Sequence, residues 1–272
     1  MYNDFYQLKE NPFNVTADSS FFFPSTAHSE AFSHLVFGIE QRKGIIAITG
    51  EIGTGKTTLC RTLLNSLTKE VKTAFILNPK FSDEQLLQII TQDLAIPGKF
   101  ENKFELVSAL NQFLLTESSQ GHNVVIIIDE AQNLSADQLE NIRLLSNIET
   151  EKEKLLQIVL VGQPELQKKL QLSELRQLNQ RISVRYHIHP LNKKETCEYI
   201  HHRLKLASNT PYTNSPIAFT NSAMRAIYSR TGGKPRMINI LCDRLLLSGF
   251  VNGTYTIRDR MVRRCAKELF LT

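Results

Sequence analysis

Apolar residues gather in short runs along the first two thirds of the chain, and polar stretches with helical periodicity separate them. Four runs are rich in branched aliphatic residues, which favour strands; they cover residues 45–49 (IIAIT), 73–77 (TAFIL), 124–128 (VVIII) and 156–161 (LQIVLV). A weaker run covers 186–189 (YHIH). The third and fourth runs are apolar at nearly every position, so we expect strands buried on both faces, as in a parallel sheet covered by helices.

Two helix starts can be read between these strands. Ser82 is followed three residues later by Gln85, and Ser135 is followed in the same way by Gln138. This is the spacing of the capping box, in which the serine and glutamine side chains bind free backbone amides of the first turn. We therefore expect helices to begin at both serines.

The strand pattern ends near residues 190–191, and helical periodicity follows from about Asn192. Breaks in this part fall at Thr210-Pro211, Ser215-Pro216, Gly232-Gly233 and Asn252-Gly253. We predict an α/β fold with two domains, a three-layer αβα core over residues 1–191 and a small all-helical domain over residues 192–272.

Composition and length fit a soluble globular protein. The chain has 272 residues, of which 42% are hydrophobic and 22% charged, enough for one large or two modest domains. No apolar run approaches the roughly 18 to 20 residues of a membrane span, and the start MYNDFYQLKE is not that of a signal peptide. Four widely spaced cysteines form no CxxC pair, so we expect reduced thiols in a cytoplasmic protein.

The strongest chemical signal is residues 50–57 (GEIGTGKT), which match GxxxxGK[ST] between a predicted strand and a predicted helix. Glycines let backbone amides surround phosphate groups, and the helix N-terminus adds partial positive charge. We expect Lys56 to reach the β- and γ-phosphates of a nucleotide and the Thr57 hydroxyl to bind Mg²⁺. The predicted nucleotide-binding residues of this loop are Gly50, Glu51, Ile52, Gly53, Thr54, Gly55, Lys56, Thr57 and Thr58.

Acidic and amide side chains follow the third and fourth strands. Asp129 would hold the water shell of the metal, and Glu130 would polarise an attacking water as general base. A protein that only binds phosphate has less need of the second acid, so the pair favours hydrolysis; the alternative is an acidic pair that caps a helix. Gln163 would position the water or contact the γ-phosphate, unless it is a turn residue before Pro164.

Three arginines, Arg176, Arg181 and Arg185, lie just before the fifth predicted strand. They fit a solvated helix face, a patch for nucleic-acid phosphates, or an arginine finger that reaches the ATP of a neighbouring subunit. The residues by themselves favour the solvated face. A second feature, GGKPR at 232–236, reads as a turn that ends one helix and starts another, with Arg236 exposed at its end.

Together these motifs resemble the AAA+ ATPases, and within them the general secretion pathway protein A group, which includes pilus-biogenesis ATPases. The resemblance runs through almost the whole chain. It is carried by residues 5–13 (FYQLKENPF), 25–35, 50–59 (GEIGTGKTTL), 126–134 (IIIDEAQNL), 139–149 (LENIRLLSNIE), 160–166 (LVGQPEL), 175–182 (LRQLNQRI) and 232–246 (GGKPRMINILCDRLL).

The resemblance implies a P-loop core in which the strand before Gln163 lies between the P-loop strand and the strand before Asp129, followed by a helical lid. It makes Gln163 the expected sensor 1 residue, although many AAA+ proteins have asparagine there. It makes Arg181 the expected finger, with Arg176 as second candidate. It also makes Arg236 a sensor 2 residue, which reaches the γ-phosphate from the lid.

The resemblance also implies that Asn11, Pro12 and Phe13 flank the adenine; the alternative is that Phe13 is a buried core aromatic. It implies an ATPase that uses ATP and Mg²⁺, forms rings or dimers, and powers or regulates assembly of a type II secretion or type IV pilus machine through protein partners. Such a protein would be cytoplasmic, or peripheral at the inner membrane through a partner.

One departure and one alternative accompany this expectation. Longer members of the group continue into a membrane span and a peptidoglycan-binding region that this sequence lacks, so we do not expect direct binding to the cell wall. The alternative is a DNA-linked ATPase similar to the transposition regulators. The modest net charge of +5 and the lack of a dedicated DNA-binding motif favour the envelope role.

Overall fold

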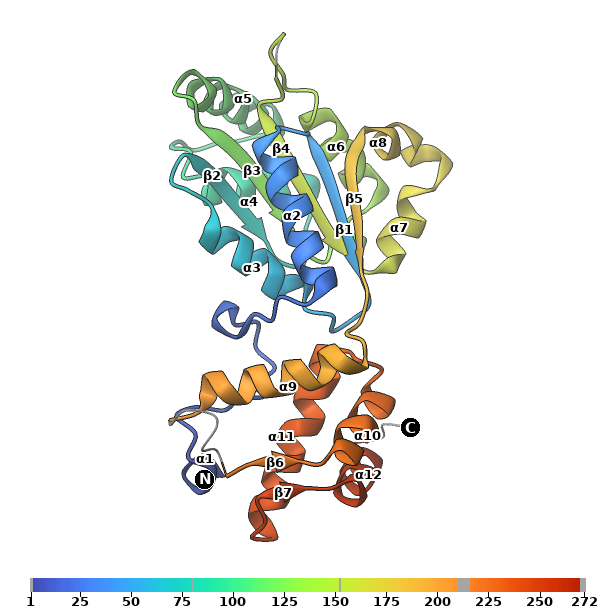
Figure 1. The fold of residues 1–272 in the computed structure, drawn as a ribbon. Helices are drawn as coiled ribbons and strands as arrows, with labels where there is room; N and C mark the ends of the chain where they lie inside the picture. The colour runs from blue at the N-terminus through green and yellow to red at the C-terminus, as the bar shows by residue number, and fades with distance from the viewer. Residues whose placement is uncertain (1, 80, 152, 210–215, 270–272) are drawn as a thin grey trace. The chain divides into compact units, whose positions relative to one another are not determined.

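The computed structural model describes residues 2–79, 81–151, 153–209 and 216–269 (Figure 1). The chain forms two compact units. One contains Ser29–Glu51 and Leu59–Ile188, and the other contains the described residues up to His28, Ile52–Thr58, and the described residues from His189 onward. The N-terminal residues therefore cluster with the C-terminal helices, whereas the sequence suggested the core; a functional boundary at residue 191 stays a prediction. The predicted breaks at Thr210-Pro211 and Ser215 lie outside the described residues.

The first unit is built on a five-stranded parallel sheet with the order β2-β3-β4-β1-β5. Its strands are β1 (Ile45–Gly50), β2 (Val71–Ile76), β3 (Asn123–Ile128), β4 (Leu156–Gly162) and β5 (Ile182–Ile188). Strand β4 lies between β1 and β3, which confirms the expected order. Every residue of β1 and β4 is buried, as branched aliphatic side chains on both faces require.

Strand β5 begins at Ile182, four residues before the sequence predicted. Ile182, Val184 and Ile188 are buried, while Ser183 and Arg185 are exposed. The strand therefore carries polar residues on the face away from the core, as an edge strand often does. Because of this alternation, the first half of the strand contains no continuous apolar run.

Helices cover both faces of this sheet (Figure 1). They are α2 (Thr26–Glu40), α3 (Lys56–Ser66), α4 (Asp83–Asp93), α5 (Lys103–Ser119), α6 (Ala136–Leu145), α7 (Pro164–Leu170) and α8 (Arg176–Arg181), with short 3₁₀ turns at Ala131–Asn133 and Ser173–Leu175. The capping boxes predicted at Ser82 and Ser135 are both formed, and they start α4 and α6. The hydrophobic core lies between these helices and the sheet.

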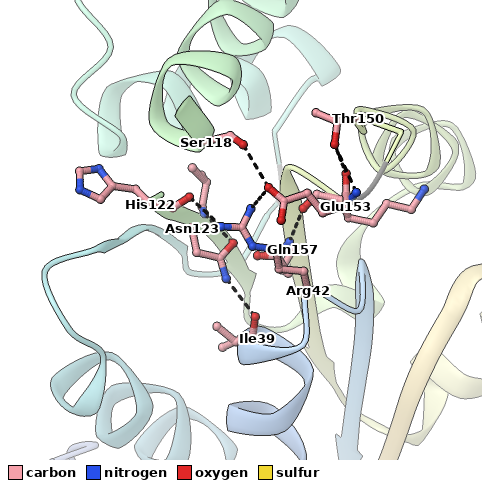
Figure 2. Close-up of polar contacts among 10 residues, drawn as sticks. Ile39, Arg42, Ser118, His122, Asn123, Thr150, Glu153 and Gln157 are labelled. Carbon is pink, nitrogen blue, oxygen red and sulfur yellow. Dashed lines mark hydrogen bonds and ion pairs between the residues drawn. The ribbon is translucent and has the colours of Figure 1, made fainter. Parts of the chain in front are cut away.

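A polar network lies at the amino-terminal ends of the strands of this sheet (Figure 2). The Arg42 guanidinium donates to the Glu153 carboxylate at 2.8 Å and to the His122 carbonyl at 3.2 Å. Ser118 donates to the same carboxylate at 3.2 Å. Beside them, Gln157 Oε1 is the one buried side-chain atom without a hydrogen-bond partner in the part of the chain that the structure describes. The network ties the loop before β4 to helices α2 and α5.

The second unit is mainly helical. It contains α1 (Tyr2–Tyr6), α9 (Lys193–Ala207), α10 (Asn221–Thr231), α11 (Pro235–Val251) and α12 (Asp259–Glu268), with a 3₁₀ turn at Ser19–Phe21. A feature that the sequence did not predict is a short parallel ladder between β6 (Ala218–Phe219) and β7 (Thr256–Ile257). No helix within the described ranges has both the length and the apolar content needed to cross a bilayer.

The turn between α10 and α11 shows why both glycines of GGKPR are present. Gly232 ends α10 with φ +57°, and its N–H donates to the Tyr228 carbonyl at 2.9 Å. Gly233 has φ +71°, and its carbonyl accepts from the Leu191 amide at 2.9 Å. A Cβ on Gly233 would lie 1.8 Å from the Leu191 carbonyl oxygen, so no larger residue fits there. Pro235 begins α11, as predicted.

Candidate functional site

The glycine-rich loop follows β1 and leads into α3. Gly53 and Gly55 have φ values of +79° and +95°, which L-residues rarely adopt. The residue between them, Thr54, is fully buried, and the Lys56 side chain is nearly so. Alternating left-handed glycines at a helix start aim successive backbone amides into one concavity, which suits an anion. A nearly buried lysine that directly follows Gly55 supplies a positive charge, which fits a phosphate group.

Arg236 lies directly against this loop. Its backbone N–H donates to the Gly53 carbonyl at 3.1 Å. Its side chain covers the glycine, because a Cβ on Gly53 would lie 2.7 Å from the Arg236 Cβ. The side chain remains exposed to solvent. The structure thus brings the candidate sensor 2 residue to the loop, and its contact with a γ-phosphate stays a prediction.

A second residue also contacts the loop, and sequence analysis did not single it out. The His28 Nε2 lies 2.8 Å from the Thr54 carbonyl oxygen. His28 occurs within residues 25–35, which were noted only as part of the family resemblance. A histidine in an amphipathic helix gives no sign of its partner, because that partner is 26 residues away along the chain.

The candidate acids follow β3. The Asp129 N–H donates to the Ile76 carbonyl at 2.9 Å, and its buried carboxylate accepts from the Glu130 N–H at 2.9 Å. Glu130 has φ +54° and ψ +37°. A left-handed residue other than glycine costs about 1–2 kcal/mol, and such outliers gather at functional sites.

Two glutamine amides hold the Glu130 carboxylate. Gln163 Nε2 donates to it at 3.0 Å, and Gln132 Nε2 donates to the same oxygen. The Gln132 Oε1 also accepts from the Gln163 backbone N–H at 3.0 Å. Gly162 leaves room for this arrangement, because a Cβ there would lie 2.9 Å from Gln132 Oε1. Sequence analysis missed Gln132, which it noted only within residues 126–134 as part of the family resemblance.

The register of the sheet explains why Gln163 lies next to Glu130 and Gln132. Thr49 of β1 pairs with Gly162 of β4, and Ile128 of β3 pairs with Leu160 of β4. The residues that follow these strands therefore lie at one edge of the sheet. Ligands of parallel α/β sheets bind at the carboxyl ends of the strands, and Figure 1 shows β3, β4 and β1 side by side.

The three arginines before β5 differ in their surroundings. Arg185 donates to both the backbone carbonyl and the side-chain oxygen of Asn179. Arg181 ends α8, is exposed, and makes a long 3.4 Å contact with the Ser146 hydroxyl. Arg176 begins α8 and is also exposed. Arg185 is therefore engaged within its own chain, which leaves Arg181 and Arg176 as the candidate fingers.

The Asn11-Pro12-Phe13 segment has a clear structural role. Phe13 is buried in the core of the helical unit. The Asn11 amide donates to Asp243 at 3.1 Å, and the Pro12 carbonyl accepts from the buried Arg203 guanidinium. These contacts fit the interpretation of Phe13 as a core aromatic, and a contact with adenine stays a prediction.

Comparison with known proteins shows which proteins have similar sequences. Residues 39–170 match the AAA domain family. The chain is 40% identical to general secretion pathway protein A of Aeromonas hydrophila over 258 residues, which cover 94% of this chain and 46% of that protein. The resemblance read from the motifs is therefore confirmed, and the chain spans about half the length of this relative.

Solved structures with the same architecture confirm the fold. Cdc6p from Pyrobaculum aerophilum superposes with a TM-score of 0.69 at 20% identity, covering 92% of this chain and 71% of that one. The ORC2 protein of Aeropyrum pernix in its ADP form gives 0.67 at 16% identity, covering 96% and 73%. The Thermotoga maritima RuvB motor gives 0.52 at 16%, covering 90% and 69%. The fold is that of the P-loop AAA+ proteins.

Proposed function

Since residues 39–170 match the AAA domain family and the chain is similar to a general secretion pathway protein A, we propose that this protein hydrolyses ATP to ADP and phosphate. One observation supports hydrolysis of ATP over binding alone: the amides of Gln132 and Gln163 hold the Glu130 carboxylate in place. A general base has to be fixed within hydrogen-bond reach of the water that it deprotonates, and a protein that only binds nucleotide has no use for it.

Each part of the site has a proposed role. Lys56 and the loop amides bind the β- and γ-phosphates, and Glu130 takes the proton of the attacking water. The Thr57 hydroxyl and the buried Asp129 carboxylate are oxygen ligands of the kind that Mg²⁺ prefers. The bound ion would neutralise charge on the phosphates. The hydrogen bond from Gln163 supports a role in positioning Glu130, besides the contact with water or the γ-phosphate expected from the sequence.

Two further roles concern charge on the γ-phosphate. Arg236 reaches it from the start of α11, and Arg181 reaches it from a second copy of the chain, with Arg176 as the other candidate. The exposure of Arg181 at the end of a helix supports this role, because a finger has to project from its own subunit. The protein would therefore act as a ring or a dimer.

The proposed biological role rests on the named relative. A secretion pathway protein that shares 40% identity with this chain supports a role in assembling a secretion or pilus machine of the cell envelope. We place the protein in the cytoplasm or at the inner membrane, where a protein partner would recruit it. The names of the AAA domain family and of this relative do not mention DNA, so they do not favour the DNA-linked alternative.

Phosphate release from ATP tests the proposal. We expect turnover with Mg²⁺, none with excess EDTA, and none in Lys56→Ala, with little change when duplex DNA is added. Absence of turnover in every condition would contradict the ATPase. Strong stimulation by DNA that weakens as salt rises would contradict the envelope role and favour the DNA-linked one.

A further inference from the structure

His28 is enclosed on several sides. It is the third residue of α2 and only 5% exposed. Its Nδ1 lies 2.7 Å from the Ser25 hydroxyl oxygen, and its Nε2 lies 2.8 Å from the Thr54 carbonyl oxygen. The ring of Phe22 meets the imidazole edge-on at 5.9 Å. Both ring nitrogens thus have a partner, and one partner is the backbone of the glycine-rich loop.

These partners fix the tautomer of the imidazole. A carbonyl oxygen can only accept, so the Nε2 of His28 carries a hydrogen and donates it to Thr54. Burial lowers the pKa of His28, which favours the neutral ring, and the Nδ1 then accepts from the Ser25 hydroxyl. The same hydroxyl accepts from the His28 backbone N–H at 3.3 Å. Ser25 therefore holds the ring with its donor toward the loop.

The hydrogen bond to Thr54 has a consequence for the next amide. In a planar trans peptide the carbonyl and the following N–H point in opposite directions. A donor that fixes the Thr54 carbonyl on one side therefore aims the Gly55 N–H to the other side. The Arg236 N–H, bound to the Gly53 carbonyl, orients the Thr54 N–H in the same way. Close packing supports this arrangement, because a Cβ on Gly55 would lie 3.1 Å from His28 Nε2.

We propose that His28 is a positioning residue of the nucleotide site, which orients the phosphate-binding amides of the glycine-rich loop by donating to the Thr54 carbonyl. The proposal rests on the ATP site proposed above. It assigns His28 no contact with nucleotide and no part in proton transfer. It predicts that the loop is ordered before the nucleotide arrives, since the hydrogen bond is formed by the chain itself.

Two conservative substitutions separate this role from general packing. In His28→Gln the side-chain amide reaches the place of the imidazole Nε2 and can still donate to Thr54. In His28→Asn the amide reaches only the place of Nδ1, near Ser25, and the donor to Thr54 is lost. Both variants remove the ring, so they share any loss of packing. Arg42→Ala, at the opposite ends of the strands, is the control for lowered stability alone.

Three measurements apply to each variant: the Kd of a fluorescent ATP analogue, amide hydrogen exchange of a peptide covering residues 50–58 without nucleotide, and the Tm. We expect His28→Asn to raise the Kd about fivefold to tenfold, the worth of one buried hydrogen bond, and to speed exchange in the loop. His28→Gln should stay within about twofold of the wild type. Arg42→Ala should lower the Tm and leave the Kd unchanged.

Equal Kd values in His28→Asn and His28→Gln would overturn the proposal, whether both match the wild type or both are weakened. If His28→Asn does not fold, Ser25→Ala replaces it; it keeps the imidazole and frees its orientation, so faster exchange in the loop is expected and unchanged exchange would contradict the role. A wild-type protein that binds no ATP would refute the proposed function, and hydrogen exchange without nucleotide would still decide the role of His28.

Discussion

The backbone N–H of Arg236 donates to the carbonyl of Gly53 at 3.1 Å. Helix α11 therefore begins at the glycine-rich loop, and both residues belong to one compact unit. A turn that looked isolated in the sequence, GGKPR, thus places a positive charge beside the amides that would bind phosphate. The glycines set the path of the chain, and the arginine occupies its end.

Replacing Arg236 tests whether its charge serves nucleotide chemistry. We expect Arg236→Ala to lower kcat for ATP about 100-fold, the usual effect of removing one charge-stabilising donor, with an unchanged Tm because the side chain is exposed. Arg230→Ala, which removes an exposed arginine from α10, is the matched control and should be neutral. Wild-type hydrolysis and wild-type nucleotide-dependent assembly in Arg236→Ala would make GGKPR a structural turn only.

The two glycines of this turn differ in what surrounds them, and their alanine variants should differ as well. In Gly232→Ala the added Cβ would lie in open space, and the only strain is the left-handed backbone. The substitution should therefore lower the free energy of unfolding by about 1–2 kcal/mol. Gly233→Ala collides with the Leu191 carbonyl, so it should cost about 3 kcal/mol or more, or prevent folding. Urea unfolding measures both costs. Equal costs would show that the chain relaxes easily around residue 233.

A finger supplied by a second subunit predicts complementation. Arg181→Ala and Glu130→Gln should each be nearly inactive, yet a mixture should exceed the sum of the two, because some interfaces combine an intact Arg181 with an intact Glu130. The same mixture with Arg176→Ala tests the other candidate. Arg185→Ala is the control, since that side chain is bound to Asn179. No gain on mixing with either Arg181→Ala or Arg176→Ala would argue against a finger acting in trans.

Stability should depend on pH through His28. Its pKa in the folded protein is lowered, chiefly by burial, against opposing effects of the Thr54 hydrogen bond and the nearby Glu195 carboxylate. Below the ordinary value of 6.5, the unfolded chain binds a proton that the folded chain does not, so stability falls as pH falls toward the lowered pKa. Above 6.5 the effect is absent.

His28→Gln removes this titration and retains the donor to Thr54, so the variant isolates the effect. Urea unfolding at about pH 7.5 and about pH 5.5, on either side of the ordinary histidine pKa, should show a larger loss for the wild type. His201 and His202, whose pKa values burial also lowers, are present in both proteins and cancel in the comparison. An equal loss in both would contradict a neutral, buried His28.

Much of the core could be predicted from the sequence because it depends on local patterns. The buried strands are continuous aliphatic runs, and the two serine capping boxes depend on residues only three positions apart. The apolar pattern predicts the start of β5 too late, because exposed residues such as Arg185 interrupt it. The family resemblance places the N-terminal segment beside the adenine and so in the core, and its sparse apolar residues Tyr6 and Phe13 do not show that they pack with the C-terminal helices.

The sequence predicts the motif residues of the candidate site but not the residues that hold them in position. The motif residues Lys56, Asp129 and Glu130 follow from short spacings that chemistry requires. Gln132 contacts a side-chain carboxylate and His28 a backbone carbonyl, and the positions of both partners are set by the fold. Neither residue belongs to a spacing rule, so only the three-dimensional arrangement identifies them.

Glu130→Gln shows whether Glu130 is the general base of an ATPase. The variant keeps the size of the side chain and one oxygen that can accept from Gln132 and Gln163, but it cannot take the proton of water at neutral pH. Nucleotide affinity and Mg²⁺-dependent phosphate release should be measured on the same samples. We predict an unchanged Kd for ATP with hydrolysis reduced at least about 100-fold; hydrolysis at the wild-type rate would show that Glu130 is not the general base.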